Sequence, residues 1–354
     1  MADALSYMNT PVREDMQNIE VIDKVDRRFF ESEIVPAHKP VVFKGLVTDW
    51  PLVKCARRSP QAVMEYLGER DTPGGVWTLE TDSAADRRFF YSDDLKGFNF
   101  QRKVSSFRKF TQRLLDYAGK ASAPALSIQS AFVDEYFYGL RETHPMPLFS
   151  GSVRPRIWIG NSSVVATHYD DAENIACVGA GTRRFTLFPP DQIKNLYVGP
   201  LDKTPAGAPV SMASLTPPEL EKFPKLATAL ENALVAELEA GDAIYIPTLW
   251  WHHVEALADI NVLVNFWNGG SLTGASGPMP LDSLLLALLT LKSKPRQVKA
   301  AWKAFFDYYV FEMEGEPGSH LPDDLKGILG EIDEAGAMHL KKWLIQQLSQ
   351  DTDS

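Results

Sequence analysis

Between residues 151 and 270 the chain alternates between short apolar runs and residues that break regular structure. The runs have the length of strands and are rich in β-branched and aromatic residues; they are Arg156–Ile159, Val164–Tyr169, Phe185–Phe188, Ala243–Ile246 and Asn261–Trp267. Pro189 and Pro247 stop two of these runs, and Gly269-Gly270 follows the last one. Several short strands bounded in this way are typical of an all-β sandwich or barrel. We therefore predict a mainly β core in this region.

A longer segment, residues 200–235, interrupts the apolar runs. It begins with a Pro-rich stretch, and its second part predicts a helix near residues 217–235. A long insertion on a β scaffold is often a lid or a loop that faces the substrate. We expect this insertion to be a segment of that kind.

The region before the core, residues 1–150, mixes strand and helix patterns. Pro40–Phe43 is a short apolar run typical of a strand, and Ser59-Pro60 can begin a helix as its N-cap and first helical residue. Apolar residues at helical spacing predict a second helix near residues 105–118. We predict that these N-terminal α/β elements pack on the core at residues 151–270.

The region after the core, residues 271–354, is predicted to be helical. Its apolar and aromatic residues concentrate at Leu281–Leu291, Val298–Phe311 and Met338–Leu348. Such residues in terminal helices commonly serve a core or a subunit interface. The chain is thus expected to contain N-terminal elements, a β core and a C-terminal helical region.

Composition limits the classes of function. The formal net charge of −10 argues against a protein that coats nucleic acid through bulk positive charge, so a nucleic-acid partner is disfavoured. The two cysteines, Cys55 and Cys177, cannot build a disulfide framework and indicate a reducing compartment. The polar N-terminus lacks an apolar signal core, and the longest apolar run, Leu284–Leu289, is too short to span a bilayer. We expect a soluble, cytoplasmic protein without membrane contact.

One group of residues in the β region carries metal-binding chemistry. His168 and Asp170 stand two positions apart at a strand end, and alternate residues of a strand point to the same side. A third ligand has to come from another strand, and His252 and His253 are the other histidines of this region. Two histidines and one carboxylate form the facial triad of non-haem Fe(II) oxygenases, which leaves coordination positions open.

Several segments resemble the JmjC hydroxylases, and the nearest likeness is to the cupin-like group that includes the asparaginyl hydroxylase of hypoxia-inducible factor. The segments occur in the family's order; they are Pro40–Trp50, His168–Asn174, Arg183–Gln192, Gly241–Pro247, Trp250–Glu255 and Val264–Trp267. The resemblance implies a double-stranded β-helix (jelly-roll) core with Fe(II) as the metal and 2-oxoglutarate as the cosubstrate.

The resemblance also implies roles for single residues. The first metal histidine falls on His168, the carboxylate on Asp170 and the distal histidine on His252, which leaves His253 beside the site. The basic residue that grips the far carboxylate of 2-oxoglutarate falls on Arg183, where the family usually has lysine. An arginine can bind a carboxylate through two parallel hydrogen bonds, so this role survives the exchange.

The remaining pocket residues partly follow the family. The family's asparagines fall on Asn174 and Asn265, and its aromatic wall falls on Trp267. Two usual cosubstrate ligands are replaced, because a common hydroxyl residue three positions before His168 is Val165 and a tyrosine on an earlier strand falls on Ser127. The metal ligands are therefore complete, whereas the cosubstrate pocket is altered.

The resemblance implies a dioxygenase that hydroxylates an amino-acid side chain of a protein or peptide. Three alternatives stay open: a metal-binding cupin-like protein without 2-oxoglutarate turnover, a metal-dependent enzyme that does not use 2-oxoglutarate, and a hydroxylase of a small molecule or an RNA base. The resemblance further implies a homodimer formed through the C-terminal helices.

Overall fold

The structure is a computed structural model and describes residues 16–82, 87–149, 151–205, 207–270 and 279–349. The chain divides into two compact units, Met1–Met279 and Pro280–Ser354. The predicted N-terminal elements and the predicted β core thus share the first unit. The predicted boundary at residue 271 lies outside the described residues.

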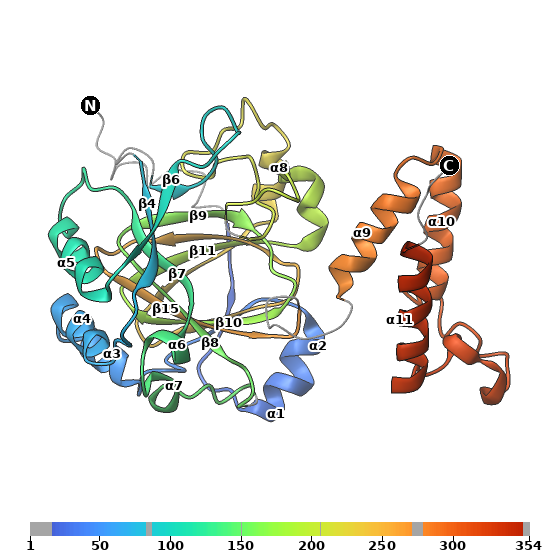
Figure 1. Cartoon of the computed structure of the whole chain (residues 1–354), viewed down its shortest axis with the longest axis horizontal. Helices are drawn as coiled ribbons and strands as arrows, with labels where there is room; N and C mark the ends of the chain where they lie inside the picture. The colour runs from blue at the N-terminus through green and yellow to red at the C-terminus, as the bar shows by residue number, and fades with distance from the viewer. Residues whose placement is uncertain (1–15, 83–86, 150, 206, 271–278, 350–354) are drawn as a thin grey trace. The chain divides into compact units, whose positions relative to one another are not determined.

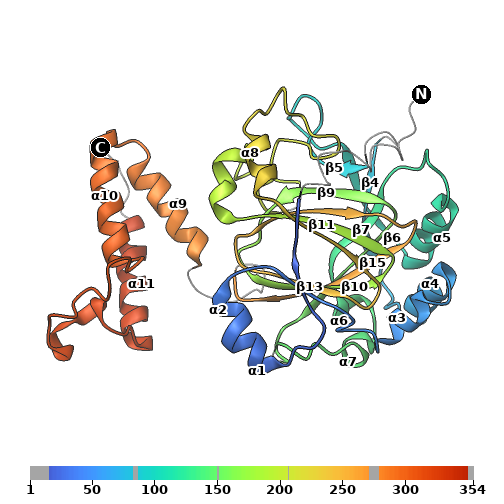
Figure 2. The same ribbon diagram turned by 180° about the vertical axis from the view of Figure 1, so that it is seen from behind.

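The first unit is built on two β-sheets (Figures 1 and 2). The smaller sheet has the order β1 (Gln17–Asn18), β12 (Leu234–Glu239), β11 (Thr182–Phe188), β14 (Trp251–Ala256), β9 (Ser163–His168), β5 (Arg88–Phe89). The larger sheet has the order β2 (Glu20–Ile22), β3 (Val41–Phe43), β13 (Ala243–Ile246), β10 (Glu173–Ala180), β15 (Asn261–Asn268), β8 (Pro155–Gly160), β7 (Leu126–Phe132), β4 (Val76–Thr81), β6 (Phe100–Ser105). This architecture confirms the predicted mainly β, jelly-roll core.

Two apolar layers hold the sheets in place. Between the sheets, side chains of both pack together, among them Phe185 and Val254 of the smaller sheet and Ile244 and Leu263 of the larger one. The opposite face of the larger sheet packs against helices; these are α3 (Pro51–Ala56), α4 (Pro60–Gly68) and α5 (Phe107–Tyr117). Both faces of the larger sheet are therefore covered by apolar side chains.

Short helical segments complete the first unit, and they connect strands rather than form a layer. They are α1 (Arg27–Phe29), the π-helical turn Phe30–Ile34, α2 (Val35–Ala37), α6 (Val133–Tyr136), α7 (Leu140–Thr143), η4 (Pro190–Asn195) and α8 (Leu226–Glu231). The two predicted N-terminal helices are present as α4 and α5, and the hydroxyl of Ser59 caps α4 by accepting a hydrogen bond from the amide of Ala62 at 3.1 Å.

The predicted helix near residues 217–235 is wrong for most of its length. Only Leu226–Glu231 is α-helical, and the chain then enters β12 at Leu234. In β12 Leu234, Ala236 and Leu238 pack in the layer between the sheets, whereas Glu237 and Glu239 are exposed, which is a strand period. Pairing with β11 on one side and β1 on the other satisfies its backbone groups and decides for the strand.

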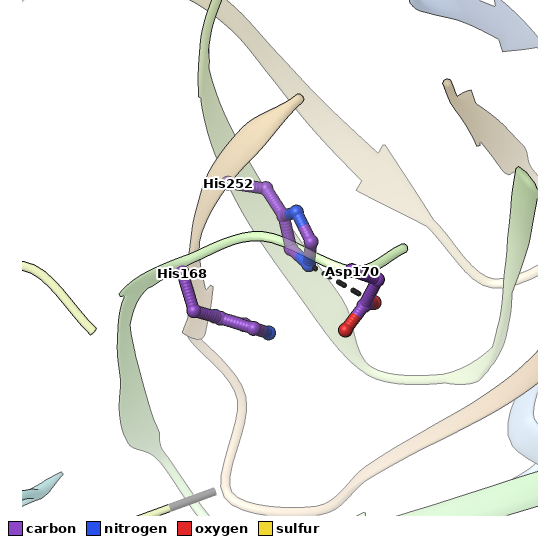
Figure 3. A group of neighbouring side chains, drawn as sticks. All are labelled: His168, Asp170 and His252. Atoms are coloured by element: carbon purple, nitrogen blue, oxygen red, sulfur yellow. Dashed lines mark ion pairs between the residues drawn. The ribbon is translucent and has the colours of Figure 1, made fainter. Parts of the chain in front are cut away.

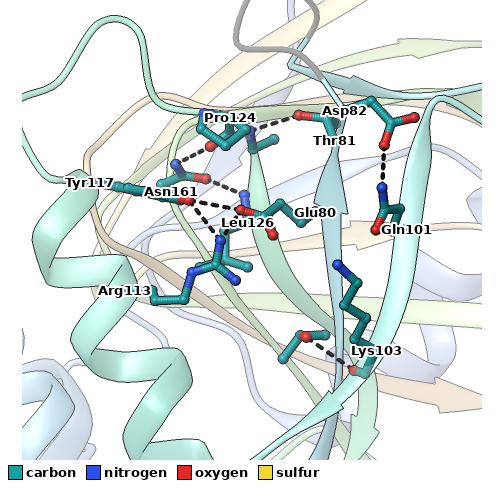
Figure 4. A network of polar contacts seen from close by, with 12 residues as sticks. Glu80, Thr81, Asp82, Gln101, Lys103, Arg113, Tyr117, Pro124, Leu126 and Asn161 are labelled. Atoms are coloured by element: carbon teal, nitrogen blue, oxygen red, sulfur yellow. Dashed lines mark hydrogen bonds and ion pairs between the residues drawn. The ribbon is translucent and has the colours of Figure 1, made fainter.

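A polar network anchors the N-terminal helix α5 and the strand β7 to the sheet (Figure 4). Glu80 on β4 accepts hydrogen bonds from Arg113 and Tyr117 of α5, the latter at 2.8 Å. Asn161 accepts from the amide of Leu126 at 2.8 Å and donates to the carbonyl of Pro124 at 2.9 Å. These contacts fix the start of β7 beside β8, the strand that borders the site on this side.

The described part of the second unit, residues 280–349, contains the helices α9 (Pro280–Leu291), α10 (Arg296–Tyr309) and α11 (Glu334–Leu348), with short 3-10 turns at Asp323–Leu325 and Gly327–Leu329. The helical prediction for this region is therefore confirmed. Many of its large apolar side chains are exposed, among them Trp302 at 46%, Phe305 at 55% and Trp343 at 51%. Within the described ranges, none of the chain's helices combines the length and the apolar character that a bilayer-spanning segment requires.

Candidate metal centre

Two neighbouring strands of the smaller sheet bring three predicted ligands together. His168 ends β9, Asp170 follows two residues later, and His252 lies on β14 directly opposite His168 in the strand register. One ligand atom from each side chain lies within 4.8 Å of the other two, and all three residues are buried. Figure 3 shows the three side chains converging on one point. The group thus offers two nitrogens and one oxygen to a single ion.

Backbone hydrogen bonds set the orientation of both imidazoles. The Nδ1–H of His168 donates to the carbonyl of Ala166 at 2.8 Å, and the Nδ1–H of His252 donates to the carbonyl of Trp250 at 3.0 Å. Each ring therefore bonds the backbone carbonyl two positions earlier in the chain. With the proton on Nδ1, the Nε2 atom of each ring keeps its lone pair for a metal.

The electrostatics of the group also fit a cation. Burial and the neighbouring His168 lower the pKa of His252 well below its usual value, so its ring is neutral at pH 7. Burial raises the pKa of Asp170, whose carboxylate lies 3.6 Å from Nε2 of His252. A neutral ring does not compensate a buried carboxylate, whereas a divalent cation does. The donor set of two histidines and one carboxylate fits Fe(II).

An irregularity in β9 controls which side chains face the centre. His168 pairs with His252 and Val165 with Val254, so β9 spans three residues where β14 spans two. This extra residue is a β-bulge, which shifts the side-chain alternation along the strand. As a result Val165 and His168 both line the same cavity although they are an odd number of positions apart.

The cavity at the centre lies between the two sheets. Its lining includes the triad and residues of both sheets; they are Trp158, Val165, His168, Asp170, Asn174, Ala176, Arg183, Phe185, Ile246, His252, Val254, Leu263, Asn265 and Trp267. The predicted residues Arg183, Asn174, Asn265 and Trp267 are thus all brought to the triad. Apolar side chains form most of the remaining wall, as is common for small-molecule sites.

Among the described residues that line the cavity, Arg183 is the one with a cationic side chain. It lies on β11 and is 6% exposed, and its side chain forms no hydrogen bond or ion pair with any described residue. Burial lowers its pKa to about 10, which still leaves it charged at pH 7. The next residue, Arg184, points to the other face and pairs with Glu237 at 3.0 Å. A buried charge without a partner is costly, so Arg183 fits an anionic ligand such as a carboxylate.

The two asparagines lie on the larger sheet and contact each other in the wall of the cavity. Nδ2 of Asn265 donates to Oδ1 of Asn174 at 3.0 Å. Beside them the indole of Trp267 partly opposes the rise that burial causes in the pKa of Asp170, but its Nε1 has no hydrogen-bond partner among the described residues. Trp267 and Asp170 both line the cavity.

Two residues considered with the site lie elsewhere. Ser127 is on β7, where its hydroxyl donates to the carbonyl of Ile128 at 3.1 Å, and it is not among the residues lining the cavity. His253 follows His252 on β14 and is also absent from the lining; its Nδ1 lies 3.5 Å from the hydroxyl of Thr167. The alternation of a strand places His252 and His253 on opposite faces.

Trp158 is a lining residue that sequence reasoning missed. It lies on β8, where Ile157 and Ile159 are fully buried in the layer under the helices and Trp158 is half-buried on the opposite face. Its ring stands edge-on to Trp267, with ring centroids 6.4 Å apart. The alternation of Arg156–Ile159 could have indicated that Trp158 faces away from the two isoleucines, but not that this face borders a cavity.

Comparison with known proteins agrees with this geometry. Residues 26–270 match the cupin-like domain family. The chain is similar to the lysine-specific demethylase JMJ31 of Arabidopsis thaliana, with 24% identity over 75% of this chain and 53% of that protein. It is similar to the Jumonji C domain-containing protein 5 of Drosophila melanogaster, with 24% identity over 71% of this chain and 59% of the relative.

A third relative is covered more fully. The tRNA wybutosine-synthesizing protein 5 of Mus musculus is 34% identical over 69% of this chain and 75% of its own length. The first two matches span little more than half of the relatives they match. Together the matches support the broad JmjC and cupin-like resemblance of the sequence, whereas the nearer likeness to the asparaginyl hydroxylase group stays a prediction.

Proposed function

This chain belongs to the cupin-like domain family, and we propose that it is an Fe(II)- and 2-oxoglutarate-dependent dioxygenase that hydroxylates an amino-acid side chain of a protein or peptide. One observation carries the proposal: a single cavity combines a triad of two histidines and a carboxylate with a buried arginine that has no partner among the described residues. The triad suits Fe(II), and the arginine suits the far carboxylate of 2-oxoglutarate.

Each residue of the cavity has a distinct part in this proposal. His168, Asp170 and His252 would hold Fe(II) from one side, with their rings fixed by the backbone hydrogen bonds. Arg183 would bind the distal carboxylate of 2-oxoglutarate through its guanidinium. Fe(II), 2-oxoglutarate and dioxygen together supply the conversion of a C–H bond to C–OH, with succinate and carbon dioxide as the other products.

The surrounding residues would control solvent and orientation. Val165, Phe185 and Leu263 present apolar side chains to the cavity, which limits the water around the reacting groups. Asn174 and Asn265 offer amide groups near the metal end, where they can orient the cosubstrate or the substrate. Trp267 would form the aromatic wall beside them.

A second candidate is the hydroxylation of an RNA base. Two observations favour it: the 34% identity to a protein named for tRNA wybutosine synthesis, and a basic stretch from Lys96 to Arg113 that contains no acidic residue. Within it Arg102, Lys103, Arg108 and Lys109 are exposed. The chain's net charge of −10 speaks for a protein or peptide substrate instead, and we keep that as the main proposal.

The setting of the enzyme is also part of the proposal. We infer a cytoplasmic location from the two cysteines, which indicate a reducing compartment. We infer a homodimer that assembles through the C-terminal helices, because α10 exposes Trp302 and Phe305 along one apolar groove that also includes Val298 and Ala301. Exposed apolar surface of this kind marks an interaction site more often than a solvent face.

Succinate release tests the function. The protein is reconstituted anaerobically with Fe(II), then given 2-oxoglutarate and air in the presence of peptides, RNA or no substrate. The proposal expects succinate above a His168→Ala control, increased by peptides. Stimulation by RNA alone would favour the second candidate. Background succinate in every arm would mean a metal-binding protein without turnover or an enzyme that does not use 2-oxoglutarate.

A further inference from the structure

We propose that Trp158 is a cosubstrate-binding residue, whose indole N–H donates a hydrogen bond to the distal carboxylate of 2-oxoglutarate beside Arg183. The inference rests on the proposed function, because it concerns the same cavity. It goes beyond that function by assigning the donor that replaces the two hydroxyl groups missing from this pocket.

The first observation is a buried donor without a partner. Nε1 of Trp158 is inaccessible to solvent and has no hydrogen-bond partner among the described residues, while the side chain lines the cavity. Nε of Arg183 and Nε1 of Trp267 are in the same condition in the same cavity. Buried donors in folded proteins are almost always paired, so three such donors around one cavity point to acceptors that a ligand supplies.

The second observation is that Trp158 and Arg183 lie equally far from the metal-binding end of the cavity, measured in residues along their strands. On the smaller sheet, Arg183 pairs with Ala256, four residues along β14 from the metal ligand His252. On the larger sheet, Trp158 pairs with Leu263, four residues along β15 from Trp267. Four strand residues span about 13 Å. The side chains of Arg183 and Trp158 are long enough to reach part of this distance along their strands toward the metal ligands.

Trp267 marks the metal-binding end of the cavity on the larger sheet. It pairs with Asn174 on β10, the fourth residue after the ligand Asp170, so Trp267 lies at the level of the triad. Trp158 therefore belongs to the end of the cavity remote from the triad. A 2-oxoglutarate molecule chelating the metal through its keto acid would direct its other carboxylate toward that end, between Trp158 and Arg183.

The third observation concerns the donors that are absent. Val165 lines the cavity but has no polar atom in its side chain, and Ser127 is not among the lining residues. Without Trp158, Arg183 would be the only side-chain donor that the described lining residues offer at the remote end of the cavity. An indole N–H donates a hydrogen bond but cannot accept one. It therefore suits a carboxylate, which accepts hydrogen bonds, and does not suit a ligand group that donates them.

The test compares two 2-oxoacids and two tryptophan variants. Trp158→Phe keeps an aromatic ring but removes the N–H, and Trp77→Phe is the matched control because Trp77 is a 46% exposed residue of β4 outside the cavity. Titration calorimetry on the Mn(II)-loaded protein under anaerobic conditions measures binding of 2-oxoglutarate and of 2-oxobutyrate, which lacks the distal carboxylate.

We expect Trp158→Phe to weaken 2-oxoglutarate binding at least about tenfold, because a hydrogen bond to a charged acceptor is lost. Its affinities for 2-oxobutyrate and for Mn(II) should stay within about twofold of the wild type, and Trp77→Phe should change none of the three. Equal weakening for both 2-oxoacids would mean lost packing and would overturn the assignment. So would 2-oxoglutarate affinity within twofold of the wild type.

A measurement on the wild-type chain covers the case in which Trp158→Phe does not fold. With ¹⁵N-labelled indoles and Zn(II) as a diamagnetic metal, one indole N–H resonance should move downfield with 2-oxoglutarate and not with 2-oxobutyrate. No such difference would refute the role of Trp158 while leaving the proposed function intact. A wild-type protein that does not bind 2-oxoglutarate would remove both.

Discussion

His168 and His252 are direct partners across a pair of antiparallel strands, with ring centroids 4.1 Å apart and each Nδ1 hydrogen-bonded to the backbone carbonyl two residues earlier. The two rings are thus positioned by the backbone rather than by other side chains. Asp170, the second residue after β9, supplies the third ligand atom. A centre built in this way is largely formed before a metal binds.

Metal affinity should depend on His252 and not on its neighbour. We expect His252→Ala to weaken Mn(II) or Fe(II) binding on the order of a hundredfold or more, because the ion loses one of three protein ligands. His253→Gln should bind the metal like the wild type, since the side chain lies on the other face of β14. Anaerobic titration calorimetry measures both. Equal losses in the two variants would show that the chain uses the two histidines in a different register.

Removing the charge of Arg183 should stabilise the ligand-free protein. Burial lowers the pKa of this side chain to about 10 without any compensating partner, a penalty on the order of 3 kcal/mol. The penalty is fully present at pH 7, because the side chain is protonated in both the folded and the unfolded state below its folded pKa. Arg183→Met should raise the free energy of unfolding by roughly 1 to 3 kcal/mol.

The same variant should lose its response to the cosubstrate. In thermal unfolding, 2-oxoglutarate should raise the midpoint of the metal-loaded wild type and leave that of Arg183→Met unchanged, since the anchor for the distal carboxylate is gone. Arg184→Met is the matched control, because Arg184 pairs with Glu237 on the other face of β11. An Arg183→Met protein that is less stable than the wild type and still responds would contradict both roles.

His144 should make the protein sensitive to mild acid. Burial lowers its pKa to about 4, with Nδ1 bonded to the carbonyl of Leu140 and Nε2 accepting from the amide of Leu52. Because the folded pKa lies below the unfolded value of 6.5, the unfolded state takes up the proton first as the pH falls. The free energy of unfolding should therefore drop by about 2 kcal/mol between pH 7 and pH 5 from this residue alone.

Chemical denaturation at the two pH values measures this effect, and His144→Gln isolates it. The variant should be less stable at pH 7, because the buried hydrogen bonds are disturbed, but its stability should change less between pH 7 and pH 5. A wild type and a variant with the same pH dependence would show that other groups determine the acid response.

Self-association should depend on α10. We expect a dimer in light scattering at micromolar concentration, and Phe305→Glu should produce a monomer because it places a charge in the apolar groove beside Trp302. Leu201→Glu is the control, since Leu201 is a comparably exposed apolar residue of the first unit, at 47%. A monomeric wild type would contradict the proposed homodimer.

The strands were predictable where turn residues mark both ends. Ala243–Ile246 has the same bounds in the sequence analysis and in the structure, because Gly241-Asp242 precedes it and Pro247 ends it. β14 was missed for a physical reason: all six of its residues are buried, including His253 and Glu255, so no alternation of polar and apolar residues reveals it. The first two residues of β12 fall within the predicted helix near residues 217–235, because the strand closely follows the real helical turn Leu226–Glu231.

The site was predictable to the extent that it is local. His168 and Asp170 stand close in the chain, whereas choosing His252 over His253 needs the pairing of β14 with β9. Whether a residue can contact the cosubstrate depends on the face of the strand that its side chain occupies. Matching residues along the sequence does not reveal this face. Ser127 occupies the expected position in the chain without reaching the cavity, and Trp158 borders it with no motif around it.

The additional residue in β9 has a consequence for the evolution and engineering of this centre. Successive side chains of a strand alternate between its two faces. The bulge between Val165 and His168 adds one residue and so shifts this alternation by one position. Deleting one residue there would leave every ligand type in the chain and still turn the imidazole of His168 toward the wrong face. The metal site is therefore encoded by the number of residues as much as by their identity, and a gap at this point in a homologue is a warning that the ligand has been lost.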